Sequence, residues 1–579
     1  MEKSKSMEEC VMCSDLQNDK HGEVRIKHSL NKKEEEFVVK RREAVFQSLQ
    51  KLKIHCSQDE VPRIALLGSG GGQRAMVGLL GSLVQLDKAG LLDCILYLSG
   101  VSGSTWCMAS LYQEPDWSTN LKIVKDKIIK RLSGPRVSLT DALAKLKKYY
   151  YENDIFSLTD IWAVMAITEY VKEIDEHTLT DQQDQHNKDP LLIYTVIDVQ
   201  SKQCRDGDAW FEISPYEAGY SLTGAFVKAS SFGSQFDNGC KIKDQPEMDM
   251  LYLQALCGSS FADGEENKKF IWKQIRDFFN LSLGANTGMF EEINKDSNCP
   301  PVDKCSQVLM DLADMNLSVL NGTDPRALDE SIRTTLKELT GDKHQLDFQV
   351  QKLNFADEEA AKLYMKQYTI DVCNYLSSWF SFWPFDVCLS ICRCAALWIW
   401  GRKYDFLHNM TDKTVPATLL ESETRDYIDA GLLLNSPYFS VLREERNIDL
   451  IISLDFSEGD PFATVRETTD MCKKQNIPFP EVNIPNVEVQ KQKDFYVFKG
   501  QNAPTVILIP LFNVVSCGEE VENWRNKYCT CQSSYSTEMI TDLMEVAGKN
   551  ISNNREKLKE EIHAVIEQKR SKQMKLLTV

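Results

Sequence analysis

The order of apolar and polar positions predicts two strand–turn–helix units early in the chain. Residues 63–67 form an apolar run that enters the glycine loop 68–72, and apolar residues then recur at helical spacing over 74–89. A second apolar run, 94–98, leads into the Gly/Ser turn 99–104, after which helical spacing resumes. Strand, glycine loop, helix, strand, turn and helix within about 40 residues indicate an α/β fold with parallel strands.

The rest of the chain supplies helices and a few late strands. A charged stretch over 24–52 carries apolar residues near one helical face, and short apolar runs at 449–455 and 505–509 are typical of buried strands. Because no internal repeat or long low-complexity linker separates these elements, we expect one large α/β domain with insertions. The expected organisation is a flexible tail over 1–22, an N-terminal helix over 23–56, the catalytic domain over 57–548 and a C-terminal helix over 549–579.

Composition and charge narrow the classes of function. The 579 residues are 42% hydrophobic and 26% charged, so a large core can be buried. Lys and Arg total 67 against 85 Asp and Glu, which gives a net charge of -18. This acidity argues against a nucleic-acid partner, since phosphate binding needs local basicity. Attraction to an anionic membrane would have to be local.

The cysteines and the N-terminal residues favour a reducing compartment. There are 18 cysteines, and the first residues are polar and charged, unlike a secretory signal. Cys10 and Cys13 form a CxxC pair, but no second pair stands at zinc-site spacing, so we expect no metal site. No apolar stretch reaches the ~18 residues of a membrane-spanning helix. We therefore expect a cytoplasmic protein.

The turn after the second strand carries a serine with catalytic potential. Ser102 lies in the sequence Gly-Val-Ser-Gly-Ser between a strand and a helix. A serine on such a tight turn projects its hydroxyl, and the following helix N-terminus favours developing negative charge. The fifth position of the usual G-x-S-x-G pattern is Ser104 here. A plain Gly/Ser loop is the alternative.

The glycine loop at 68–72 has three interpretations. Its exposed amide N–H groups could hold the oxyanion of acyl transfer, or the pyrophosphate of a dinucleotide, or simply form a tight turn. Gln73 occupies the position where a dinucleotide fingerprint has glycine, and no Gly-Lys-Ser/Thr sequence of a P-loop follows.

A serine nucleophile needs a base, and histidines are scarce. None of the 8 lies in a glycine-rich turn, and His408, in a polar loop, is the least unsuitable of them. Asp429 is a more visible candidate, because it ends an apolar run just before a small-residue turn. A turn-capping aspartate is the alternative interpretation.

Taken together, these segments resemble the group IV cytosolic phospholipase A2 family of patatin-like hydrolases. The resemblance runs in order from about residue 60 to 530, and the combination of its glycine loop, serine turn and DxGL motif is specific. The matching segments are GSGGGQRAM (68–76), LSGVSGSTW (98–106), FSLTDIW (156–162), WFEISPYEAG (210–219), GAFVKASSFGSQF (224–236), WIWGRKYDFLHN (398–409), DAGLLLNSPY (429–438) and ISLDFSEGDPF (452–462).

The resemblance implies a patatin-like α/β fold with a mixed, largely parallel sheet and a helical cap. It implies a dyad in which Ser102 attacks a phospholipid ester and Asp429 takes its proton. Gly71 and Gly72 would then form the oxyanion hole, and Arg74 would bind the substrate phosphate. Such a site needs no cofactor and no metal. A free aspartate, with a pKa of ~3.9, is a weak base, so the carboxylate would have to lie in a partly dry site.

Arg446 aligns less closely with a second functional arginine of the family. It belongs to the sequence LREER, which follows the aspartate motif. Substrate binding is one interpretation of this arginine, and a surface ion pair is the other.

The chain differs from many family members at its N-terminus. Only about 60 residues precede the first strand, fewer than the ~120 of a calcium-binding C2 domain, and no prenylation box ends the chain. The resemblance is therefore to the calcium-independent, C2-lacking gamma-type branch. We expect peripheral association with intracellular membranes.

An aromatic region near 365–410 is the expected cap. It could pack on the core or insert into a membrane interface through Trp379, Phe380, Phe382, Trp383 and Phe385. Palmitoylation of Cys388, Cys392 or Cys394 is a weaker alternative.

The expected activity is calcium-independent cleavage of fatty acyl esters from phospholipids and lysophospholipids. Transfer of the acyl group to another lipid is a plausible side reaction, since an acyl-serine does not require water as acceptor. The alternatives are an inactive lipid-binding or membrane-scaffolding protein and a nucleotide-binding oxidoreductase.

Overall fold

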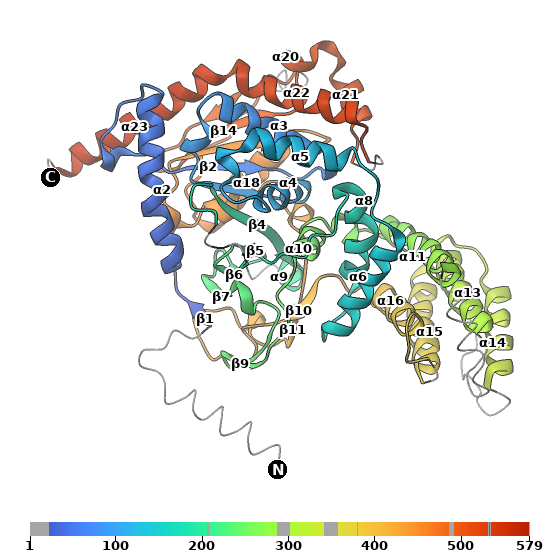
Figure 1. The fold of residues 1–579 in the computed structure, drawn as a ribbon. Helices are drawn as coiled ribbons and strands as arrows, with labels where there is room; N and C mark the ends of the chain where they lie inside the picture. The colour runs from blue at the N-terminus through green and yellow to red at the C-terminus, as the bar shows by residue number, and fades with distance from the viewer. Residues whose placement is uncertain are drawn as a thin grey trace. The chain divides into compact units, whose positions relative to one another are not determined.

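The computed structural model describes residues 23–181, 183, 185–204, 208–285, 302–340, 357–378, 380–485, 491–530, 532 and 534–577. The chain divides into two compact units (Figure 1). The first comprises Met1–Val137, Met165–Ser260 and Lys403–Val579, and the second comprises Ser138–Val164 and Phe261–Arg402. The single domain expected over 57–548 therefore contains a second, inserted unit.

Five parallel strands form the centre of the first unit. They lie in the order β4-β3-β2-β12-β14, so that β2 separates β3 from β12. Every residue of these strands is buried, as their apolar sequences predict for strands covered on both faces. The bounds are β2 (Ile64–Gly68), β3 (Tyr97–Gly100), β4 (Leu191–Asp198), β12 (Leu450–Asp455) and β14 (Thr505–Pro510). The mixed, largely parallel sheet predicted from the sequence is confirmed.

Antiparallel strands extend this sheet to twelve described strands. Beyond β4 the order is β5, β6, β7 and β1, and beyond β14 comes β13, while β11 pairs with β4. A separate hairpin is formed by β8 and β9. The bounds are β1 (Val24–Ile26), β5 (Trp210–Ile213), β6 (Glu217–Tyr220), β7 (Ala225–Lys228), β8 (Gln235–Asp237), β9 (Cys240–Lys243), β10 (Arg402–Tyr404), β11 (Thr424–Asp429) and β13 (Tyr496–Phe498).

The N-terminal helix is shorter than the predicted 23–56. Val24–Ile26 instead forms β1, which pairs with β7, and the helix α2 spans Lys32–Lys51. The Asn31 side chain accepts a hydrogen bond from the Lys33 amide at 2.9 Å, and this cap fixes where the helix begins. Periodicity alone did not separate the short strand from the helix that follows it.

Helices of the first unit pack beside the sheet, and α3 contacts both α4 and α22. Gly81 of α3 allows the close approach of α22, because a Cβ there would lie 2.7 Å from the Met544 carbonyl oxygen. Figure 1 shows α22 and α23, in red, along one side of this unit. The helices are α3 (Gly72–Lys88), α4 (Gly103–Tyr112), α5 (Leu121–Leu132), α8 (Thr168–Val171), α9 (Val199–Cys204), α10 (Met250–Cys257), α17 (Tyr438–Val441), α18 (Ala463–Gln475), α20 (Val514–Cys517), α21 (Val521–Lys527), α22 (Thr537–Asn553) and α23 (Arg555–Leu577).

The second unit is helical and larger than the expected cap near 365–410. Its helices are α6 (Leu139–Glu152), α7 (Leu158–Trp162), α11 (Glu265–Ala285), α13 (Val302–Leu320), α14 (Arg326–Thr340), α15 (Glu358–Ser377) and α16 (Phe385–Leu397). Among the described residues, no helix is both long and apolar enough to cross a bilayer.

Candidate active site

Ser102 lies on a strained turn between β3 and α4. Its backbone has φ 51° and ψ −123°, a conformation that costs a non-glycine residue free energy and that clusters at functional sites. Its side chain is close to the N-terminus of α4, where the helix dipole favours negative charge. The predicted strand–turn–helix surroundings of Ser102 are therefore present.

The glycine loop between β2 and α3 lies directly against this turn. A Cβ at Gly103 would fall 1.8 Å from the Gly72 carbonyl oxygen, and a Cβ at Gly70 would fall 3.1 Å from the Ser102 Cβ. Only glycine fits at these positions, because the two loop backbones approach closely.

The loop presents free amide groups. Gly71 and Gly72 have φ of 151° and 56°, and glycine adopts such values without strain. Within the described chain, neither of their backbone N–H groups donates to a protein acceptor. They open α3, whose first N–H groups have no partner within the helix. This arrangement can hold an anion beside Ser102.

The sheet register brings Asp429 to the same place. Residues Tyr97–Gly100 of β3 pair with Leu191–Tyr194 of β4. Further along β4, Val196 pairs with Phe211 on one side and with Asp429 on the other. Because β5 takes one side of β4, β11 must occupy the side of β3, and the C-terminal ends of β3 and β11 face each other. The serine turn follows one end, and Asp429 is the other.

The Asp429 carboxyl group is buried, with 1% of the residue exposed. Its Oδ1 accepts a hydrogen bond from the Gly431 amide at 2.8 Å, and among the described residues no donor is aligned with Oδ2. Burial raises its pKa from 3.8 to about 7, although the adjacent Ser102 hydroxyl and the Gly431 amide both favour the charged form. A carboxylate of that basicity, with one free oxygen beside a serine hydroxyl, can accept a proton.

Arg74 lies behind the glycine loop. Its Nε donates to the Phe456 carbonyl at 2.7 Å and one terminal nitrogen donates to the Tyr528 carbonyl at 2.7 Å. The other terminal nitrogen donates to Thr530 Oγ1 at 3.3 Å and would lie 2.9 Å from a Cβ at Gly71. Burial lowers the pKa of its guanidinium group. These contacts place Arg74 where it supports the loop.

Asn435 joins the loop to the aspartate segment. Its Nδ2 donates to the Gly70 carbonyl at 3.3 Å and to Ser457 Oγ at 2.9 Å, and its backbone carbonyl accepts from the Gly70 amide at 3.1 Å. Sequence reasoning did not single out Asn435, although it lies within the quoted motif that begins at Asp429. Its position six residues after Asp429 was the available signal.

Arg446 makes a different set of contacts. It is fully buried, and its guanidinium group pairs with Glu34 at 2.9 Å and Glu212 at 2.7 Å. These carboxylates raise its pKa against the effect of burial. The ion pair is therefore in the interior and not at the surface, and no described contact joins Arg446 to Ser102 or Asp429.

His408 also has no described contact with the serine. Its backbone carbonyl accepts from the Asn238 amide at 2.9 Å, and its Nδ1 is buried without a hydrogen bond.

The predicted cap residues that the structure describes are partly internal to the second unit. Phe380 and Phe385 are 2% and 1% exposed and contact each other and Phe382, whereas Trp379 lies outside the described residues. Phe382 and Trp383 are half-buried. Packing within the second unit therefore accounts for the burial of Phe380 and Phe385.

The three cysteines considered for lipidation are all buried in α16. Burial raises the pKa of the Cys394 thiol to about 12 and also raises that of Cys388, while a hydrogen bond with Cys373, together with burial, raises the pKa of Cys392. Inaccessible thiols of high pKa are poor acylation sites. Cys10 and Cys13 lie outside the described residues. Among the residues described, no group of three or more His, Cys, Asp or Glu is arranged to hold a metal ion.

Comparison with known proteins defines the class. Residues 64–263 match the lysophospholipase catalytic domain family, a range that includes the glycine loop and Ser102. The chain is 32% identical to mouse cytosolic phospholipase A2 gamma over 93% of this chain and 91% of that protein. It is 31% identical to the human protein of that name over 93% and 96%. The chain belongs to the cytosolic phospholipase A2 family.

A solved structure supports the fold. Human GIVD cytosolic phospholipase A2 superimposes with a TM-score of 0.63 at 22% identity, covering 95% of this chain and 67% of that one. A complex of that enzyme with methyl gamma-linolenyl fluorophosphonate gives a TM-score of 0.61 at 20% identity. Family and fold together define a phospholipid-hydrolysing class of enzyme.

Proposed function

We propose that the chain is a serine phospholipase A2 and lysophospholipase that works through a dyad of Ser102 and Asp429. One observation carries the proposal: a serine on a strained turn lies beside a buried carboxylate whose pKa is about 7, next to two unpartnered amide groups. Nucleophile, base and oxyanion hole are the three parts that acyl transfer needs.

The reaction proceeds in two steps. Ser102 Oγ attacks the ester carbonyl carbon while Asp429 Oδ2 accepts the hydroxyl proton, and the carbonyl oxygen becomes an oxyanion held by the Gly71 and Gly72 amides. The C–O bond to the leaving lipid then breaks, and Asp429 returns the proton to that oxygen. In the second step, water loses a proton to Asp429 and attacks the acyl carbon. The bond from that carbon to Ser102 Oγ breaks, Asp429 returns the proton to Ser102 Oγ, and the fatty acid is released.

Three features make an aspartate adequate as the base. Desolvation raises its basicity, the N-terminus of α4 stabilises negative charge on the serine oxygen, and the Gly71 and Gly72 amides stabilise the oxyanion. Arg74 fixes the oxyanion loop and is the candidate for binding the substrate phosphate. We give Arg446 no substrate contact, since its donors are bound to Glu34 and Glu212.

The finer features of the activity follow from this chemistry. No step calls for calcium, because protein groups fill each catalytic role, so we propose a calcium-independent enzyme. A lysophospholipid hydroxyl can replace water in the second step, which gives transacylation. Phospholipid substrates reside in membranes, so we also propose peripheral membrane association.

The test is hydrolysis of a glycerophospholipid with a labelled acyl chain. We expect Ser102→Ala and Asp429→Asn each to lower turnover by about 10³-fold or more. Ser552→Ala, at an exposed position of α22, is the control and should retain full activity. A fluorophosphonate probe should label the wild type and the control but not Ser102→Ala. Unlabelled, inactive wild-type protein with intact lipid binding would favour the scaffolding alternative.

A further inference from the structure

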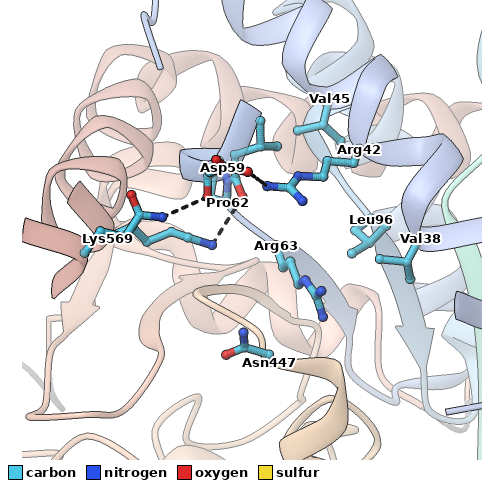
Figure 2. Close-up of a pocket in the computed structure, with 11 residues that line it drawn as sticks. Val38, Arg42, Val45, Asp59, Pro62, Arg63, Leu96, Asn447 and Lys569 are labelled. Atoms are coloured by element: carbon cyan, nitrogen blue, oxygen red, sulfur yellow. Dashed lines mark hydrogen bonds and ion pairs between the residues drawn. The ribbon is translucent and has the colours of Figure 1, made fainter. Parts of the chain in front are cut away.

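A cavity of about 260 Å³ opens in the first unit and is lined by the residues drawn in Figure 2. Arg63 precedes β2, Leu96 precedes β3 and Asn447 precedes β12, so all three lie at the N-terminal ends of parallel strands. The glycine loop and Ser102 follow the C-terminal ends of β2 and β3. At about 3.3 Å per strand residue, the two sites are roughly 15–20 Å apart.

Three cationic residues from different elements line this cavity. Arg42 comes from α2, Arg63 from the entry to β2 and Lys569 from α23. Arg42 donates to the Gln58 carbonyl and lies 3.6 Å from Asp59, whose side chain is 87% exposed, so this ion pair is loose. Lys569 is compensated, because its ammonium group is 2.7 Å from Asp449.

Arg63 is the cation without a compensating acid. Its one described side-chain hydrogen bond goes to the Arg446 carbonyl at 2.9 Å, and no described carboxylate forms an ion pair with it. Asp449 instead accepts from the Arg63 backbone amide at 2.8 Å, which fixes the position of the residue. Figure 2 shows the Arg63 side chain among the lining residues, between Arg42 and Asn447. A guanidinium group held in this way offers paired N–H donors to an anion.

The rest of the lining sets the size and polarity of a ligand. Val38, Val45 and Leu96 form an apolar wall, while Asn447 and Gln573 add amide groups. The volume lies below the roughly 300–1,000 Å³ of pockets for drug-sized molecules, so the ligand must be small. Because Lys569 is compensated by Asp449 and Arg42 pairs only loosely with the exposed Asp59, Arg63 and Arg42 are the cations left for a ligand. Two guanidinium groups suit the several oxygens of a phosphate group.

We propose that this cavity binds a small phosphate monoester, with the phosphate on Arg63 and Arg42 and a short carbon skeleton against the apolar wall. Such a group could be free in solution or carried by a lipid. The net charge of -18 disfavours approach to an anionic bilayer, so we expect the soluble source.

The test is calorimetric titration of the full chain with glycerol 3-phosphate, with butyrate as an anionic comparison. We expect saturable binding of glycerol 3-phosphate, weaker binding of butyrate, and a loss of about tenfold or more in Arg63→Gln and in Arg42→Gln. Arg136→Gln is the matched control, because Arg136 is 64% exposed, pairs with Glu169 and lies outside the cavity. It should bind as the wild type does.

Circular dichroism melting shows whether each variant is folded. Because Arg42 and Arg63 lie on separate elements, one variant still tests the proposal if the other substitution unfolds the chain. Co-sedimentation with phosphatidylcholine vesicles, with and without phosphatidic acid, distinguishes the sources. Arg63-dependent sedimentation on phosphatidic acid would make the lipid the source. The proposal is overturned if no saturable binding of glycerol 3-phosphate or phosphatidic acid occurs, or if folded Arg63→Gln and Arg42→Gln bind like the control.

Discussion

Burial keeps Asp429 partly protonated at neutral pH, since its pKa rises from 3.8 to about 7. A base must be deprotonated to act, so kcat/KM should climb with pH and level off above this value. We expect a midpoint near pH 7 in a profile measured on a soluble short-chain ester. A rate that is flat from pH 5 to 9, or a midpoint near 4, would contradict the assignment.

The same pKa has a consequence for stability. Between about pH 4 and 7 the folded chain holds a proton on Asp429 that the unfolded chain releases, so the free energy of unfolding falls as pH rises through this window. Asp429→Asn removes the group that titrates, and with it this loss of stability at high pH. We expect the variant to be more stable than the wild type at pH 8, by up to a few kcal/mol, with the difference shrinking towards pH 4. Denaturant unfolding at the two pH values measures it.

At the scale of elements, the proposed oxyanion hole depends on contact between the glycine loop and the serine turn. A methyl group at Gly103 would collide with the Gly72 carbonyl, whereas Gly459 has open space around it. We therefore expect Gly103→Ala to push the loop from the serine, to abolish most of the turnover and to cost about 1–3 kcal/mol of stability. Gly459→Ala should retain activity and melting temperature. Equal behaviour of the two variants would argue against the contact.

Local signals were sufficient to predict the elements that build this site. The apolar runs and their glycine boundaries predicted β2, β3, β12 and β14 to within a few residues, because strand and turn preferences act locally. The pairing of β11 with β4 was out of reach, since it joins residues more than 200 positions apart. The family resemblance, and not periodicity, placed Asp429 beside Ser102.

Contacts between residues that are distant in sequence also determine the surroundings of Arg446 and Arg74. Nothing in LREER indicates that Arg446 is enclosed by Glu34 and Glu212, which are distant in sequence. Two acceptors of Arg74 are the backbone carbonyls of Phe456 and Tyr528, groups that every residue carries and that leave no mark in a sequence.

At the scale of the whole molecule, the charge of -18 makes the lipid surface important. On neutral phosphatidylcholine vesicles no cation is needed to bridge protein and membrane, and in the proposed mechanism protein groups fill the catalytic roles. We expect a calcium chelator to leave turnover on such vesicles unchanged. Vesicles with anionic lipid are the comparison, because calcium can act there by screening alone. Loss of turnover on neutral vesicles, with recovery on adding calcium, would contradict a calcium-independent mechanism.

The order of the sheet also constrains how the chain can be shortened. β2 lies between β3 and β12, and β12 begins some 380 residues after the end of β2. A product that stops before Leu450 would keep both Ser102 and Asp429 but leave one edge of β2 unpaired and deprive Arg74 of its acceptors. Exposed apolar strand edges promote aggregation. A shortened chain that retains the proposed catalytic pair should therefore be insoluble and not a smaller enzyme.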